Sequence, residues 1–194
     1  MLRNLHSPPA RYPTGVSMHE THDVVGPERF CLRDGRNVCV RRITPGDAPR
    51  LGEFAARLSP NALRLRFFTP VRRFAPEMLA RLANVDFVNR AAFVVSFPDK
   101  DDILAVGRYE GETATRAEVA FIVQDELQGN GLATELLEHL AVLARQNGFS
   151  TFTAIMLPEN TEMLDVFRAS GYPLTLTLEG GVERVRLEIA QGDG

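Results

Sequence analysis

The sequence has few cysteines and no long apolar run. Its two cysteines, Cys31 and Cys39, are too few for a disulfide framework, so we expect a reducing, cytoplasmic compartment and two buried thiols. The longest apolar run, near residues 91–95, is far too short to cross a bilayer. Residues 1–20 lack the continuous apolar core of a secretory signal. We therefore expect a soluble protein with no membrane partner.

An excess of basic residues is also missing. The formal net charge is −3, which disfavours a nucleic-acid partner because nucleic-acid phosphates attract a basic surface. The same balance leaves room for a cationic acceptor such as an amine. With 194 residues, of which 44% are hydrophobic, the chain suits one domain with a sizeable core.

The first 28 residues contain prolines and histidines but no periodic apolar pattern. We interpret residues 1–28 as a flexible N-terminal arm and residues 29–194 as one domain. Within the arm, His19-Glu20-Thr21-His22 has one residue too few between its histidine and the next for the helical zinc motif. We therefore expect no metal site.

From Phe30 onwards the hydrophobic pattern becomes regular. Alternation predicts strands at Val38–Ile43, Ala91–Phe97, Ile103–Glu110, Ala117–Val123, Thr151–Leu157, Leu174–Leu178 and Val182–Ile189. Helical spacing and capping residues predict helices at about 47–58, 60–68, 76–83, 132–146 and 161–170. The three consecutive strands in the middle predict an antiparallel meander within an α+β fold.

The segment from Gln128 to Ala133 lies between a predicted strand and the longest predicted helix. A glycine-rich turn at this place can direct several backbone N–H groups at one point, and the first helical turn adds unpaired donors and the positive end of its dipole. The nucleotide-triphosphate loop requires a lysine where the chain has Leu132, and the dinucleotide fingerprint requires a glycine where it has Thr134. Alone, the turn also fits an ordinary helix start.

The residues around this turn resemble the GNAT acetyltransferase superfamily, over roughly residues 30–190. The family's Arg/Gln-x-x-Gly-x-Gly/Ala and Asn…Tyr…Gly-Phe patterns fall on Gln128, Gly131, Ala133, Asn160, Phe167, Gly171 and Tyr172. More narrowly, residues 40–47, 58–68 and 117–120 are similar to the bacterial protein-lysine acetyltransferase branch. Three motifs spaced in one order are much more specific than any one of them.

The resemblance implies the GNAT acyl-CoA N-acyltransferase fold, in which helices flank a central, mixed and mostly antiparallel sheet. It also implies acetyl-CoA as cosubstrate and an amine or protein-lysine acceptor. Neither cysteine lies near the motif to carry an acyl group, so we expect direct transfer in a ternary complex. A homodimer is one assembly open to the protein. The residues expected to bind the cofactor are Phe121, Ile122 and Val123 by their backbone, Gln128, Gly129, Asn130, Gly131, Leu132, Ala133 and Thr134 at the pyrophosphate, and Asn160 and Phe167 beside the pantetheine arm.

Glu118 is the candidate catalytic base. Strand alternation places it on one face with Ala120 and Ile122, whose apolar side chains can raise the pKa of a carboxylate. A glutamate at this position resembles the general base of the lysine-acetyltransferase branch. An ordinary solvent-facing glutamate is the alternative, with Asp125 and Glu126 as substitute bases.

The leaving thiolate has no obvious proton donor. Many relatives have a tyrosine where this chain has Phe167, which cannot donate a proton. We expect the thiolate to leave unassisted or to take a proton from water, because a thiol with a pKa near 8.5 is a tolerable leaving group. The same phenylalanine keeps a second hypothesis open, a non-catalytic module that senses acyl-CoA.

A run of arginines surrounds Phe67 and Phe68. Its members are Arg64, Arg66, Arg72 and Arg73. Such a run is typical of a solvated helix face, although an acidic substrate or the 3′-phosphate of CoA could use one of them.

Overall fold

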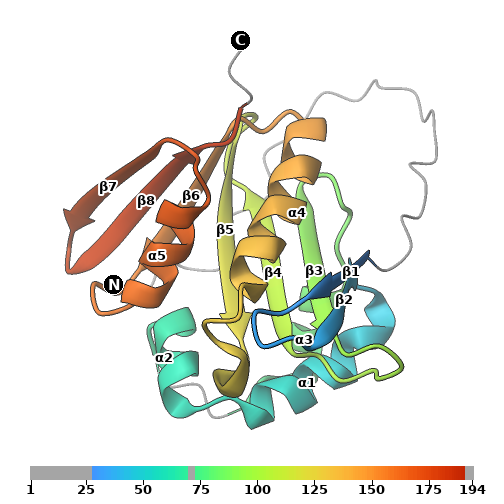
Figure 1. Cartoon of the computed structure of the whole chain (residues 1–194). Coiled ribbons are helices and arrows are strands. Elements are labelled where there is room, and N and C mark those ends of the chain that lie inside the picture. The colour runs from blue at the N-terminus through green and yellow to red at the C-terminus, as the bar shows by residue number, and fades with distance from the viewer. Residues whose placement is uncertain (1–27, 70–72, 191–194) are drawn as a thin grey trace, which may run out of the picture.

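Eight strands form one sheet in residues 28–69 and 73–190, the part of the chain that the computed structural model describes (Figure 1). The strands are β1 (Glu28–Cys31), β2 (Asn37–Arg42), β3 (Arg90–Ser96), β4 (Ala105–Gly111), β5 (Arg116–Val123), β6 (Thr151–Met156), β7 (Leu174–Glu179) and β8 (Val182–Glu188). Their order across the sheet is β1-β2-β3-β4-β5-β6-β8-β7. All neighbours are antiparallel except β5 and β6, which are parallel. The predicted mixed, mostly antiparallel sheet is confirmed.

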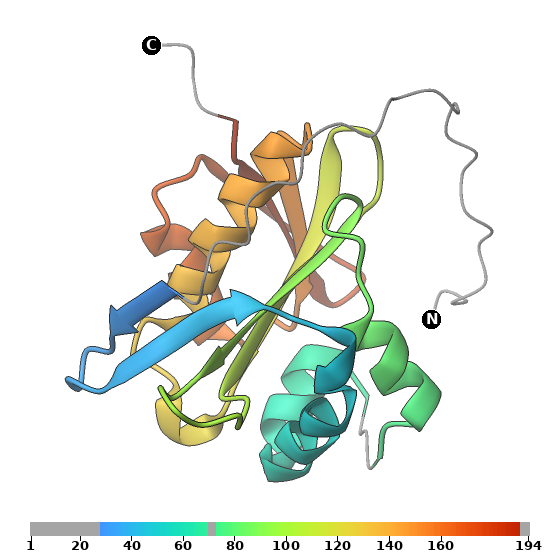
Figure 2. The same ribbon diagram turned by 90° about the vertical axis from the view of Figure 1, so that its right-hand side faces the viewer.

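Helices cover both faces of this sheet. They are α1 (Ala48–Arg57), α2 (Pro60–Phe67), α3 (Pro76–Ala83), α4 (Leu132–Gln146) and α5 (Thr161–Ala169), with short 3-10 turns η1 (Pro45–Asp47) and η2 (Asp125–Leu127). Figure 2 shows α4 on one side of the sheet and α1, α2 and α3 on the other. One face of α4 is buried against the sheet, with Leu136 and Leu140 fully inaccessible, because the helical period brings these leucines to the same face.

The predicted strands and helices are confirmed to within two residues for most ends, but the N-terminal region differs from expectation. Strand β1 was not predicted, because four residues are too short to show an alternating pattern. Residue 28, assigned to the arm, is the first residue of β1 and lies opposite Val40. The prediction that both cysteines are buried is wrong for Cys31, which is exposed on the edge strand β1, and right for Cys39. The rest of the arm, with its His19–His22 motif, and Arg72 lie outside the described residues.

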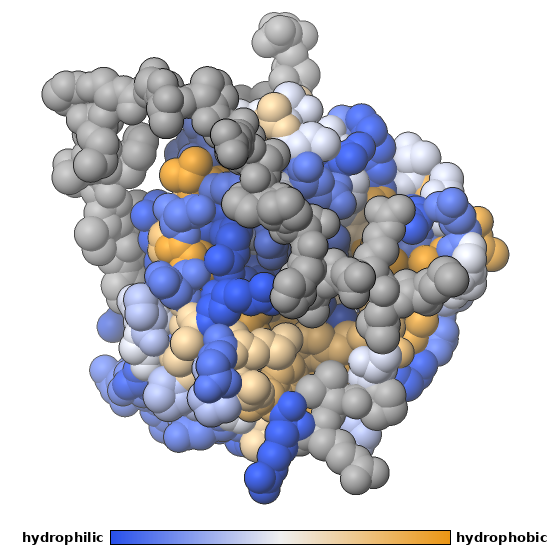
Figure 3. Space-filling view, turned by 180° about the vertical axis from the view of Figure 1, so that it is seen from behind, coloured by the Kyte–Doolittle hydropathy of each residue, from blue (hydrophilic) through white to orange (hydrophobic). Residues whose placement is uncertain are grey.

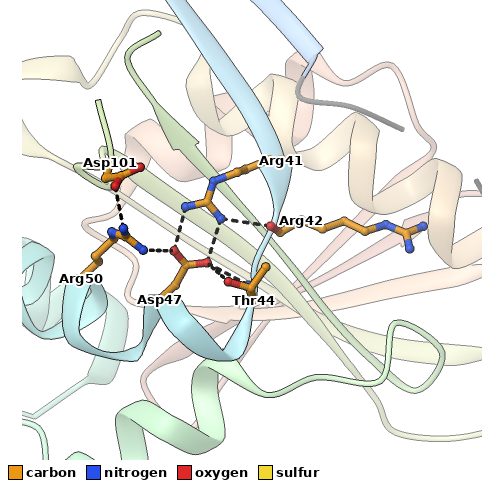
Figure 4. Close-up of polar contacts among 6 residues, drawn as sticks. All are labelled: Arg41, Arg42, Thr44, Asp47, Arg50 and Asp101. Carbon is orange, nitrogen blue, oxygen red and sulfur yellow. Dashed lines mark hydrogen bonds and ion pairs between the residues drawn. The ribbon is translucent and has the colours of Figure 1, made fainter. Parts of the chain in front are cut away.

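The junction between β2 and α1 is fixed by the buried carboxylate of Asp47 (Figure 4). It accepts two hydrogen bonds from the guanidinium of Arg41, at 2.7 and 2.8 Å, and one from the backbone N–H of Thr44 at 2.8 Å. Arg50 lies on its other side at 3.4 Å. Burial alone would raise the pKa of Asp47, but the hydrogen bonds from Arg41 and Thr44 outweigh it and bring the pKa to about 2. This network anchors the start of the α1–α3 layer to the sheet.

Candidate functional site

Strands β5 and β6 pair at one end and diverge at the other. The pairing covers residues 116–118 of β5 and residues 151–153 of β6. Beyond that point β5 stays paired with β4 as far as Val123, whereas β6 stays paired with β8 as far as Met156. The edge of β5 from residue 119 onwards therefore has no strand beside it, and a cleft opens between the two halves of the sheet.

Backbone groups of alternate β5 residues point into this opening. The N–H of Gln124 donates to the Leu104 carbonyl at 2.9 Å, and Gln124 lies opposite Leu104 in the antiparallel register. Because consecutive residues of a strand direct their backbone groups to opposite sides, Ile122 directs its N–H and C=O to β4, and Phe121 and Val123 direct theirs to the opening. The Val123 carbonyl already accepts a hydrogen bond from the Gln128 side chain at 3.3 Å. Ile122 instead contributes its side chain to the cleft.

The N-terminus of α4 closes one end of the opening. Gly129 and Gly131 have φ values of 75° and 93°, which L side chains rarely adopt, so this turn depends on glycine. The first backbone bond of the helix runs from the Glu135 N–H to the Gly131 carbonyl, and no side chain caps the helix. The N–H groups of residues 132–134 thus have no intrahelical acceptor, and the helix dipole adds partial positive charge there. A helix start of this kind is suited to holding an anion.

Two side chains donate hydrogen bonds to backbone carbonyls in and before the turn. The Asn130 amide donates to the carbonyls of Leu127 and Gln128 at 3.4 and 3.3 Å, so Asn130 supports the turn and does not line the cleft. Arg33, between β1 and β2, donates from Nη1 to the Gly129 carbonyl at 3.4 Å and does line the cleft. Sequence reasoning missed Arg33 because its partner is 96 residues away.

The resulting cleft has a volume of about 550 Å³, within the range of small-molecule sites. Its walls include every residue that we predicted to contact the cofactor except Asn130. Phe167 is almost fully buried and packs edge-on against Phe121, with ring centroids 6.3 Å apart. Asn160 caps α5, because its side-chain oxygen accepts from the Met163 N–H at 3.3 Å. Both residues form the wall across from β5.

Glu118 lies where the two strands begin to diverge. It is opposite Glu110 of β4 and Thr153 of β6, and its side chain is exposed to the cleft. Ala120 and Ile122 line the cleft with it, as strand alternation predicted. Partial burial, and then the nearby charge of Glu112, raises the pKa of Glu118. Among the described residues it has no hydrogen-bond or ion-pair partner, so its carboxylate is available to a ligand.

Other candidate acids and bases lie elsewhere. Asp125 accepts hydrogen bonds from the N–H and hydroxyl of Ser59, at 3.0 and 2.5 Å, and so ties η2 to the start of α2. Glu126 is exposed and outside the cleft wall. The Tyr172 hydroxyl donates to Glu138 and accepts from Arg145. No tyrosine lines the cleft in the described part of the chain.

None of the helices in residues 28–69 and 73–190 has the length and apolar character needed to cross a membrane. The same residues contain no group of three or more side chains that could hold a metal ion.

Comparisons with known proteins agree with this arrangement. The family model described as "Acetyltransferase (GNAT) domain" matches residues 37–173. Acetyltransferase PA5475 of Pseudomonas aeruginosa is 32% identical over 148 residues, which cover 73% of this chain and 77% of that protein. Acetyltransferase Pat of Mycolicibacterium smegmatis is 32% identical over 142 residues, which cover 72% of this chain but 42% of Pat. The crystal structure of the GNAT domain of S. lividans PAT has a TM-score of 0.77 and 37% identity, covering 84% of this chain and 96% of that domain.

Proposed function

The chain belongs to the GNAT acetyltransferase family, and from that premise we propose that it transfers an acetyl group from acetyl-CoA directly to an amine in a ternary complex. The observation that carries the proposal is the continuous path through the cleft. An uncapped helix N-terminus leads along the unpaired edge of β5 to Glu118, which has a raised pKa. A cytoplasmic location and a homodimer stay predictions from the sequence.

The proposed cofactor position follows from the donors and the walls of the cleft. The backbone N–H groups of residues 132–134 receive the pyrophosphate, and Arg33 adds a positive charge beside them. The pantetheine arm lies along β5 as an added strand and uses the backbone groups of Phe121 and Val123. Asn160 and Phe167 form the opposite wall.

In the proposed reaction, Glu118 accepts a proton from the acceptor ammonium. A lysine amine with a pKa of about 10.4 is neutral in roughly one molecule per 2,500 at pH 7, so a base is useful. The nitrogen lone pair then attacks the thioester carbonyl carbon and a C–N bond forms. The nitrogen releases its second proton to water as the C–S bond breaks. The sulfur leaves as thiolate and takes a proton from water, because the cleft wall offers Phe167 and no tyrosine. A backbone N–H of β5 stabilises the oxyanion.

Turnover with acetyl-CoA and a panel of small amines and lysine-containing proteins tests the proposal. CoA release is measured for the wild type, for Glu118→Gln, and for Glu126→Gln as the matched control, since Glu126 is exposed outside the cleft. We expect kcat/KM to fall by about 100-fold or more in Glu118→Gln and to stay within about twofold in the control.

Two outcomes would contradict the proposal. Tight acetyl-CoA binding with no turnover on any acceptor would favour the acyl-CoA sensor. Equal turnover of wild type and Glu118→Gln would remove Glu118 as the base and leave the family assignment intact.

A further inference from the structure

Arginines gather on the face of the sheet that carries Glu118. Arg66 of α2 lines the cleft together with Glu118 and stacks on the ring of Phe67 at 4.9 Å. Arg108 of β4 lies opposite Ala120, the next residue of β5 on this face. Arg66 and Arg108 also meet in a small cavity under α1–α3. Figure 3 shows this side of the molecule, where hydrophilic residues dominate the upper part and apolar residues gather lower down.

The described residues leave Arg66 and Arg108 without a partner. Neither makes a hydrogen bond there, and no carboxylate lies within 4.0 Å of either, although both are at least half-buried. The nearby Arg90 donates to the Arg81 carbonyl, and its own Nε is buried without an acceptor. Burial, and then the charges of Arg66 and Arg90, lowers the pKa of Arg108 to about 10, against the opposing charge of Glu110. Partly desolvated and mutually repelling cations are unfavourable without an anion.

A residue on the same helix shows the contrast. Arg64 is one helical position away from the cleft wall and is already paired, through a 2.7 Å contact with Glu159 and a 3.2 Å hydrogen bond to Asn61. Arg64 and Arg66 are both partly buried, but of the two only Arg64 has a polar partner among the described residues.

The position of the cluster favours the acceptor over the acyl-CoA. The proposed pantetheine path lies between β5 and β6, whereas Arg108 lies on β4, on the other side of β5. Arg66 lines both the cleft and the small cavity that Arg108 lines. We propose that Arg66 and Arg108 bind a carboxylate of the acceptor, so that the acceptor is an amine that also carries a carboxylate. Glu118 then receives the ammonium and the two guanidiniums receive the anion. This inference rests on the proposed function.

Binding of matched ligands to the CoA-loaded protein tests the inference without requiring turnover. One pair is Nα-acetyl-lysine and its carboxamide, which share the amine and differ in the carboxylate. A second pair is a blocked peptide with lysine followed by aspartate and the same peptide with asparagine. Calorimetric titration gives the dissociation constants. We expect the carboxylate member of at least one pair to bind about tenfold tighter or more, as hydrogen bonds to a charged group predict.

Variants then locate the preference. Arg66→Gln and Arg108→Gln should lose it, while Arg64→Gln removes the same charge from the same helix and should keep it. Arg108→Gln should also leave the thermal midpoint unchanged or higher, because it removes a repelling charge. A lower midpoint with an intact preference would show a structural role for Arg108 and overturn its assignment.

Three other outcomes would overturn the inference. The first is equal or undetectable binding of both members in both pairs. The second is that Arg64→Gln loses the preference for the carboxylate ligand as fully as Arg66→Gln and Arg108→Gln do. The third outcome concerns titration of the protein with succinyl-CoA and with propionyl-CoA. If succinyl-CoA binds more tightly and neither acceptor pair shows a difference, the carboxylate belongs to the acyl group and not to the acceptor. Failure of the proposed function would instead show as absent acetyl-CoA binding or absent turnover in the wild type.

Discussion

A carboxylate lies at the junction between β2 and α1, and another lies in the cleft. The two differ in burial, in hydrogen-bond partners and in the direction of their pKa shifts. Asp47 is buried and surrounded by donors from Arg41 and Thr44, which lower its pKa to about 2. Glu118 is open to the cleft, has no partner among the described residues, and has a raised pKa.

The two carboxylates differ in how many hydrogen-bond donors surround them. A carboxylate whose lone pairs are all used can hold two elements together but cannot accept a proton at neutral pH. A carboxylate in a partly dry site without donors contributes little to stability and keeps its capacity for a ligand. The same contrast holds for cations, since Arg41 is paired with Asp47 and Arg66 has no partner in residues 28–69 and 73–190.

The largest expected effect on stability is that of Asp47→Asn. It leaves the Arg41 guanidinium beside a neutral amide, and removing one partner of a buried pair costs about 3 kcal/mol or more. Denaturant unfolding measures this loss, and Glu118→Gln is the matched control, expected to lose nothing. Similar losses of unfolding free energy in both variants would contradict this difference between Asp47 and Glu118.

The acid dependence of stability should show the same asymmetry. The pKa of Asp47 is about 2 in the folded state and near 3.8 when unfolded, so its contribution is complete above pH 3.8 and disappears as the pH falls towards 2. A depression of this size corresponds to about 2 kcal/mol. Between pH 5 and pH 2, the free energy of unfolding should therefore fall more steeply with decreasing pH for the wild type than for Asp47→Asn. Parallel curves would contradict this.

Two glycines lie at the ends of α4, and of these Gly131 lines the cleft while Gly148 does not. Gly131 and Gly148 have φ values of 93° and 86°, and neither has a protein atom within 4 Å of an added Cβ. Alanine at either position should cost about 1 kcal/mol of unfolding free energy. We expect Gly131→Ala alone to weaken CoA binding, measured by calorimetry, because Gly131 lines the cleft at the proposed pyrophosphate site. Equal affinity in both variants would remove the turn from the binding site.

The smallest expected effect is a shift in the pH dependence of kcat/KM. The base must be deprotonated, so activity should fall as the pH drops through the raised pKa of Glu118, by about tenfold per unit. Glu112 raises this pKa and Arg66 lowers it. Glu112→Gln should therefore move the acidic limb to lower pH. A limb that does not move would argue against Glu118 as the titrating group.

Local features were predictable from the sequence. The leucine stripe of α4, the caps at Ser59 and Asn160, and the need for glycine at position 131 each depend on a few neighbouring residues, and all are present in the structure. The family resemblance and its fold were predictable for a related reason, because the motifs are short and keep their spacing. Strand β1 and the exposure of Cys31 were not, since a four-residue edge strand has too short a pattern.

The sequence alone predicts the helices and every strand except β1, the glycine turn before α4, and Glu118 as a candidate base. Which polar groups have partners depends on the tertiary structure. Asp125 is tied to Ser59, Arg64 to Glu159, and Arg33 reaches Gly129, across 66, 95 and 96 residues respectively. Such pairings depend on where β5 leaves β6 and where α2 packs on the sheet. Whether a charged side chain links two elements or stays available to a ligand depends on the neighbours that folding brings to it.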